Sequence, residues 1–223
     1  MDEPSLITTS DGSHSLYRAD LDETYHSRHG AIQESMHVFI LQGLDFLIDL
    51  TGKKQVAILE IGFGTGLNAL LTAETARRTG ADIAYTSLEA FPIAESLWSK
   101  LNYAQGETQQ ALFQSLHRAP WSVSTAIQPH FNLLKIHQTL QDVELTRASF
   151  DLVYFDAFAP AKQPEMWEIS MLEKVTQAMG DHSVFVTYCA KGQLKRDLRD
   201  MGLQVETLPG PPGKKEMVRA VKH

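Results

Sequence analysis

The segment Ile58-Leu59-Glu60-Ile61-Gly62-Phe63-Gly64-Thr65-Gly66 joins an apolar strand to a helix through three glycines. Such glycines permit a tight turn and let a ligand approach the backbone amides where the helix begins. The spacing differs from the G-x-G-x-x-G pattern of dinucleotide loops, because Leu67 occupies the position of the last glycine. Glu60 would repel a pyrophosphate and attract an ammonium group. The segment therefore predicts a ligand site, and a bare tight turn is the alternative.

Apolar periodicity predicts alternating strands and helices after this point. We expect strands at 55–61, 82–88, 131–136, 150–156 and 183–190, helices at 65–79, 93–102, 107–116, 165–179 and 193–201, and a closing hairpin of 204–208 with 216–221. Residues 120–129 match no element. The alternation predicts an α/β fold with a mostly parallel, doubly wound sheet. Residues 1–52 should add a hairpin (8–17) and a helix (31–50), packed on a main domain of residues 53–223.

Composition narrows the classes of function. A chain of 223 residues can bury a full core without disulfides. The single cysteine, Cys189, excludes a disulfide framework and a cysteine-based metal site, and the histidines have no metal-binding spacing, so no metal is expected. No apolar run is long enough to span a bilayer, and the first residues lack the features of a signal peptide. The sequence therefore predicts a cytoplasmic protein without a membrane partner.

Charge is unevenly distributed along the chain. The formal net charge is −7, yet residues 191–223 carry 8 Lys and Arg against 4 Asp and Glu. A basic face near the C-terminus is one interpretation, and an ordinary solvated helix face is the other.

Asp156 ends the apolar strand 150–156 and begins a turn that contains Phe158, Pro160 and Pro164. Open α/β sheets bind ligands at the carboxyl ends of their strands, so this carboxylate is a candidate site residue. An Asp in such a turn also commonly caps the backbone. Glu89, at the end of the strand 82–88, lies about where these folds place an acid that binds ribose hydroxyls.

Together these segments resemble a known family. The glycine segment is similar to the first motif of class I methyltransferases. With Glu89-Ala90-Phe91-Pro92, with the run 156–167 (Asp-Ala-Phe-Ala-Pro-Ala-Lys-Gln-Pro-Glu-Met-Trp) and with Gly213-Lys214-Lys215-Glu216-Met217, the chain resembles the methyltransferase half of the MnmC family of tRNA-modifying enzymes, whose stand-alone form is called MnmD. The likeness runs from about residue 12 to residue 221.

The resemblance implies a class I, Rossmann-like fold with a seven-stranded sheet. It also implies methyl transfer from S-adenosylmethionine to the 5-aminomethyl nitrogen of a modified wobble uridine in tRNA, giving 5-methylaminomethyluridine. The flavin-dependent half of the family has no counterpart in these residues, so FAD is not expected. Relatives carry Gly-Asp after the third strand, whereas this chain has Lys135-Ile136-His137-Gln138, which makes Gln138 or a backbone group the candidate for adenine recognition.

The resemblance also assigns candidate residues. The candidate catalytic residues are Asp156, which would orient the amine or accept its proton, Phe158, which would pack on the base, and Pro160, which would stiffen the turn. The candidate cofactor-binding residues are Tyr25, Ser27, Glu34, Glu60, Gly62, Phe63, Gly64, Gly66, Asn68, Glu89, Ala90, Gln138 and Asp156. The candidate tRNA-binding residues are Lys191, Lys195, Arg196, Arg199, Lys214 and Lys215. Two alternatives stay open at this point: a methyl- or aminopropyltransferase for small amines, and a non-catalytic cofactor-binding scaffold.

Overall fold

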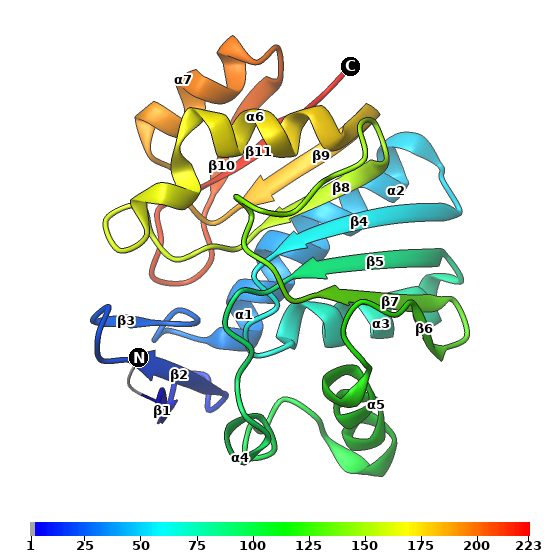
Figure 1. Cartoon of the computed structure of the whole chain (residues 1–223), viewed down its shortest axis with the longest axis vertical. Coiled ribbons are helices and arrows are strands. Elements are labelled where there is room, and N and C mark those ends of the chain that lie inside the picture. Colours follow the sequence, from blue (N-terminus) through cyan, green and yellow to red (C-terminus); the bar gives the residue numbers. More distant parts are fainter. Residues whose placement is uncertain (1–2) are drawn as a thin grey trace.

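The computed structural model describes residues 3–223 and shows an eight-stranded sheet with helices on both faces (Figure 1). In spatial order its strands are β10 (Gln204–Pro209), β11 (Glu216–Val221), β9 (Met179–Thr187), β8 (Phe150–Phe155), β4 (Gln55–Ile61), β5 (Asp82–Leu88), β7 (Phe131–Ile136) and β6 (Thr125–Gln128). The five strands from β9 to β7 are parallel, and antiparallel strands complete both edges. The predicted α/β class is confirmed.

The predicted count of seven strands was wrong by one. The additional strand is β6, within the stretch 120–129 that matches no periodic pattern. It is four residues long, bends at a bulge between Ala126 and Gln128, and among the described strands pairs only with β7. Because so short an edge strand is stabilised by its pairing, its own sequence carries little signal.

The two faces of the sheet bury separate apolar clusters, because successive strand residues point to opposite sides. Ile58 belongs to the cluster under α3 (Leu67–Thr79) and α5 (Gly106–Arg118), whereas Leu59 belongs to the cluster under α6 (Ile169–Ala178) and α7 (Gly192–Asp200). Figure 1 shows α6 and α7 together at the end of the molecule that carries β9–β11. This double covering explains why the central strands are apolar on both sides.

The helix predicted at 31–50 forms as one run of three parts: α1 (Ala31–Ser35), a π-helical part η1 (Met36–Asp45) and α2 (Phe46–Thr51). Gly43 lets it approach the sheet closely, since a Cβ there would lie 3.1 Å from Val186 Cγ2 and 3.3 Å from Tyr154 Cε1. Two other predicted helices are shorter. The range 93–102 contains only α4 (Glu95–Trp98), and 165–179 is divided at Glu168 into the 3₁₀ turn η2 (Pro164–Trp167) and α6.

The N-terminal segment forms a small antiparallel sheet of β1 (Ser5–Thr8), β2 (His14–Arg18) and β3 (Glu23–Thr24). It lies beyond the carboxyl ends of the central parallel strands (Figure 1). The side chain of Leu16 is buried in the same apolar cluster as Ile58. The predicted hairpin and helix are therefore present, while the division into units 1–52 and 53–223 stays a prediction. Met1 and Asp2 lie outside the described residues.

No helix between residues 3 and 223 has both the length and the apolar character needed to cross a membrane.

Candidate active site

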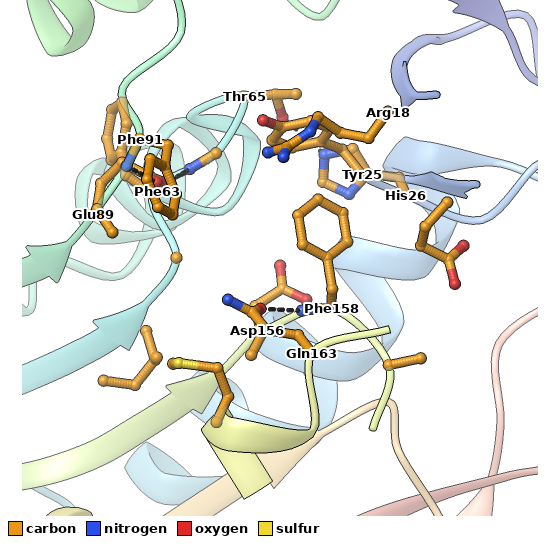
Figure 2. A pocket seen from close by; sticks show the side chains of 18 of the residues that line it. Arg18, Tyr25, His26, Phe63, Thr65, Glu89, Phe91, Asp156, Phe158 and Gln163 are labelled. Carbon is orange, nitrogen blue, oxygen red and sulfur yellow. Dashed lines mark hydrogen bonds between the residues drawn. The ribbon is translucent and has the colours of Figure 1, made fainter. Parts of the chain in front are cut away.

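A cavity of about 600 Å³ opens at the carboxyl ends of β4, β5 and β8. Its walls come from the glycine segment, the residues that follow β5 and β8, the segment 18–34 and the loop between β10 and β11. Figure 2 shows Glu89, Phe63 and Phe91 at one side, with Tyr25 and His26 at another. The volume lies within the range of small-molecule sites, which is roughly 300–1,000 Å³.

The glycine segment packs so closely that side chains cannot replace its glycines. Gly66 has φ 74°, and a Cβ there would lie 2.8 Å from Nε2 of His117. Gly64 has φ 50°, and a Cβ there would lie 3.2 Å from Cδ1 of Tyr25, on the cavity wall. Both φ values fall in the left-handed region, which glycine adopts without steric cost.

Glu89 anchors one end of the cavity. Its Oε2 accepts a hydrogen bond from Gly64 N at 2.8 Å, and its Oε1 accepts one from Phe91 N at 2.8 Å. Burial raises the pKa of its carboxyl group, and these backbone donors oppose that shift. Each carboxylate oxygen keeps a second lone pair, so Glu89 can still accept hydrogen bonds from two hydroxyl groups.

Asp156 follows β8 directly, and its side chain lines the cavity. Its backbone N–H donates to Ile61 O at 3.1 Å, which fixes the start of the turn against β4, and its Oδ2 accepts from Nδ2 of Asn68 at 2.9 Å. Burial, followed by the nearby charge of Glu34, raises the pKa of Asp156 to about 7, while Asn68 and Lys214 act in the opposite direction. A carboxyl group with this pKa can exchange protons near neutral pH.

The turn after Asp156 is fixed by hydrogen bonds on both sides. Phe158 N donates to Oε1 of Gln163 at 3.3 Å, and Nε1 of Trp167 donates to Phe158 O at 2.8 Å. Tyr188 OH donates to Ala157 O at 2.8 Å. The Phe158 ring meets Tyr25 edge-on, with 5.2 Å between ring centroids (Figure 2). The turn thus holds Phe158 in the cavity wall, and the sequence did not indicate that Tyr188 and Trp167 support it.

Glu60 is placed differently from what its sequence position suggests. Its side chain is fully buried, it is absent from the cavity wall, and its Oε2 accepts from Ser87 Oγ at 2.5 Å. Burial raises its pKa to about 8. The expected role, a carboxylate facing the ammonium of a ligand, does not fit this position, because a group in contact with the ligand must line the cavity.

The N-terminal segment meets the loop between β10 and β11 over the cavity. Nζ of Lys214 lies 2.5 Å from Oε1 of Glu34 and 3.6 Å from the centroid of the Tyr188 ring. The second oxygen of Glu34 accepts from Ser27 N at 2.6 Å. Gly213 packs against His29 so tightly that a Cβ would overlap the imidazole ring. Lys214 is therefore part of the cavity wall and paired with Glu34, and its expected role as a phosphate contact stays a prediction.

The structure brings most of the candidate ligand residues together. Those that line the cavity are Tyr25, Ser27, Glu34, Gly62, Phe63, Gly64, Asn68, Glu89, Ala90, Gln138, Asp156 and Phe158. Glu60, Gly66 and Pro160 do not. Of the candidate tRNA contacts, Lys191, Arg196, Arg199 and Lys215 are exposed, whereas Lys195 forms an ion pair with Glu216 at 2.8 Å. No group of side chains within the described residues is arranged to hold a metal ion.

The sequence analysis assigned no role to His26 and Thr65, which both line the cavity. His26 is buried, and its Nε2 lies 2.6 Å from Thr65 Oγ1. Burial lowers its pKa to about 4, so the imidazole stays neutral and links the N-terminal segment to the glycine segment. No spacing pattern signals such a contact between residues 39 positions apart.

Comparison with known proteins agrees with this geometry. Residues 105–223, more than half of the chain, match the profile of a family described as "S-adenosyl-L-methionine-dependent methyltransferase". The chain belongs to this family. The methyltransferase assignment thus rests on the half that contains the Asp156 turn, and S-adenosylmethionine is the cofactor. The glycine segment and Glu89 lie outside the matched residues and contribute to the wall of the same cavity.

The names of individual relatives are more specific than the description of the family. The chain is 31% identical over 219 residues to the "tRNA 5-methylaminomethyl-2-thiouridine biosynthesis bifunctional protein MnmC" of Cupriavidus necator, across 92% of this chain and 32% of that protein. It is 29% identical over 215 residues to the protein of the same name from Ralstonia nicotianae, with the same shares covered. The chain therefore spans about a third of the length of these relatives. The resemblance to the MnmC methyltransferase region is confirmed.

A solved structure supports the fold. The crystal structure of MnmC2 from Aquifex aeolicus aligns with a TM-score of 0.81 at 23% identity, across 99% of this chain and 70% of that one. At this identity the likeness concerns the fold alone.

Proposed function

We propose that this methyltransferase transfers the methyl group of S-adenosylmethionine to the 5-aminomethyl nitrogen of a modified wobble uridine in tRNA. The observation that carries the proposal is the Asp156 carboxyl, which lines the cavity beside the glycine segment with a pKa raised to about 7. The names of the curated relatives support tRNA as the substrate class. Such a reaction would take place in the cytoplasm.

The cavity fits the cofactor. Glu89 offers two carboxylate oxygens for ribose hydroxyls, the glycine segment allows close approach, and Ile61, Phe63 and Leu88 supply apolar wall. Gln138 lies in the wall with Thr139 and Leu140 and is the candidate for the adenine end. S-adenosylmethionine supplies an electrophilic methyl group on a sulfonium centre.

The residues of the chain then have two tasks. The first is to hold the amine in line with the methyl group, since proximity and orientation can supply most of the acceleration of a simple displacement. Phe158 and Tyr25 offer ring surfaces against which a uracil ring can pack. The second task is to receive a proton, because an alkylammonium cannot attack. Asp156 accepts this proton directly or through water. Its raised pKa lies closer to the pKa of the amine than that of an ordinary aspartate does, which favours the proton transfer.

The deciding experiment is incubation with labelled S-adenosylmethionine and tRNA that carries 5-aminomethyluridine, followed by nucleoside analysis. We expect label in 5-methylaminomethyluridine, and Asp156→Asn should lower turnover by roughly 10²–10⁴-fold. tRNA that lacks the aminomethyl group is the matched control. Methylation of small amines but not of this tRNA would identify the small-amine enzyme, and cofactor binding without turnover on either would identify the scaffold.

A further inference from the structure

Behind the cavity wall, a buried set of polar groups connects Glu60 to Asp156. Glu60 Oε1 and Asn68 Oδ1 are both buried and, within the described residues, have no hydrogen-bond partner. The other end of the Asn68 amide, Nδ2, donates to Asp156 Oδ2 at 2.9 Å. The Asn68 side chain also lies within hydrogen-bonding reach of the Glu60 carboxyl.

A proton can satisfy both orphaned oxygens. An ionised carboxylate and an amide oxygen are acceptors only, so they cannot pair with each other. Leaving two such groups buried without partners is costly. A proton on Oε1 of Glu60 turns this atom into a donor for Oδ1 of Asn68, while Tyr85 Oη, which also has no partner among the described residues, lies near the same carboxyl group. The same proton also fixes which way the amide of Asn68 is turned, since its nitrogen then has to face Asp156.

We propose that Glu60 is a positioning residue that stays protonated, donates to Oδ1 of Asn68, and thereby holds the Asn68 amide so that its nitrogen donates to Asp156. The role in catalysis rests on the proposed function, whereas the protonation and the hydrogen bond do not. Glu60 acts through Asn68 and touches no ligand, as expected of a side chain that is fully buried and absent from the cavity wall.

The charges around the two carboxyl groups agree with a protonated Glu60 beside an ionised Asp156. Around Glu60 lie Tyr85, Tyr154 and Asp156, of which only the last carries a charge near neutral pH, and it disfavours a second negative charge. Burial raises the pKa of Glu60 to about 8, although the polar groups of Ser87, Tyr85 and Asn68 beside its carboxylate lower it. Asp156 faces Glu34, Lys214 and Tyr188 in addition, and its pKa is raised to about 7. When two buried acids compete for one charge, the better-solvated one ionises, and Asp156 is the one that meets the cavity.

Infrared spectroscopy of the whole protein without substrate tests the protonation. We expect the wild-type protein near neutral pH to show the carbonyl stretch of a protonated, buried carboxylic acid. Because the pKa of Asp156 is itself raised to about 7, the spectra are compared in the Asp156→Asn background. The band should persist in Asp156→Asn and disappear in the double variant Asp156→Asn/Glu60→Gln. Absence of the band from Asp156→Asn, or its persistence in the double variant, would overturn the proposal. This result is independent of whether the tRNA assay succeeds.

The pH dependence of methyl transfer tests the positioning. Glu60→Met has a similar length but cannot donate, so we expect kcat to fall roughly tenfold and the acid limb of the pH profile to move, while the affinity for S-adenosylmethionine measured by calorimetry changes little. Glu60→Gln can donate through its amide and should restore the position of the acid limb. An unmoved acid limb in Glu60→Met, or an equal displacement in both variants, would contradict the role. Thermal unfolding of both variants checks that they fold.

Discussion

The ammonium group of Lys214 lies 2.5 Å from the carboxylate of Glu34 and connects the loop before β11 to the start of the helical run 31–51. The side chain of Glu34 is only 6% exposed, and that of Lys214 is 30% exposed. The two residues are 180 positions apart, yet they close one wall of the same cavity. A loop and a segment that lie far apart in the sequence thus line the same cavity.

Lys214→Met should destabilise the protein, because it leaves the Glu34 carboxylate buried without its cation. A fully buried pair would cost more, but partial exposure of Lys214 reduces the expected loss to about 1–3 kcal/mol. Urea unfolding gives the value. Lys215→Met is the matched control, since Lys215 is exposed and should change stability by less than about 0.5 kcal/mol. Equal effects of the two changes would show that the ion pair adds nothing.

The rate of methyl transfer should rise with pH through about 7, where Asp156 loses its proton and becomes able to accept one. Below this pH the carboxyl is protonated and inactive as a base. Because Lys214 lowers the pKa of Asp156, Lys214→Met should move the midpoint of the acid limb to higher pH. Single-turnover rates measured across pH give both midpoints. A midpoint near the ordinary pKa of an aspartate would indicate that Asp156 only orients the amine.

Glu89→Gln should weaken the binding of S-adenosylmethionine by roughly tenfold to a hundredfold. The neutral amide replaces a charged acceptor of hydroxyl groups, and bonds to charged partners contribute about 1.5–3 kcal/mol. Isothermal calorimetry measures the affinity. Glu95→Gln provides the control, since Glu95 is exposed on α4 and forms an ion pair with the exposed Arg118. An unchanged affinity of Glu89→Gln for S-adenosylmethionine would show that this residue does not bind the cofactor.

Gly66→Ala and Gly80→Ala, at the two ends of α3, separate two costs of replacing a glycine. Both glycines have positive φ, 74° and 69°. For that reason each substitution should lower the free energy of unfolding by about 1–2 kcal/mol. Only at Gly66 would the added Cβ also collide, with the ring of His117, whereas nothing lies within 4 Å at Gly80. We therefore expect Gly66→Ala to be the more destabilising and to weaken cofactor binding, measured by thermal unfolding and calorimetry. Equal losses would mean that His117 moves aside.

Charge reversal of Arg196 and Arg199 should weaken tRNA binding without changing cofactor affinity. Both are exposed on α7, close in sequence to the exposed Lys191. Each phosphate contact that is lost should reduce, by about 0.7–0.9, the slope of the logarithm of the tRNA binding constant against the logarithm of the salt concentration. Arg147→Glu is the control, because Arg147 is exposed just before the amino end of β8, away from the cavity. Binding that falls equally in all variants would indicate a general charge effect.

The sequence by itself determined the order of the elements and which strand ends carry the candidate ligand residues. Apolar runs such as 55–61 and 150–155 became central strands, because residues buried on both faces must be apolar along their whole length. The glycines and acidic residues at the ends of these runs lie around one cavity, because the carboxyl ends of parallel strands meet at one edge of the sheet. Strand β6 was not predicted, because its stability comes from an edge pairing that leaves little pattern in the chain.

Only the tertiary structure decided which side chains face the ligand and which face the core. Glu60 and Glu89 both come at or near strand ends, yet Glu60 points into the interior and Glu89 into the cavity. Lys214 and His26 joined the wall through contacts with residues 180 and 39 positions away. Such pairings depend on how separate elements dock, and local periodicity carries no information about docking. The raised pKa values of Glu60 and Asp156 follow from the same cause, because burial shifts a pKa and burial exists only in the folded chain.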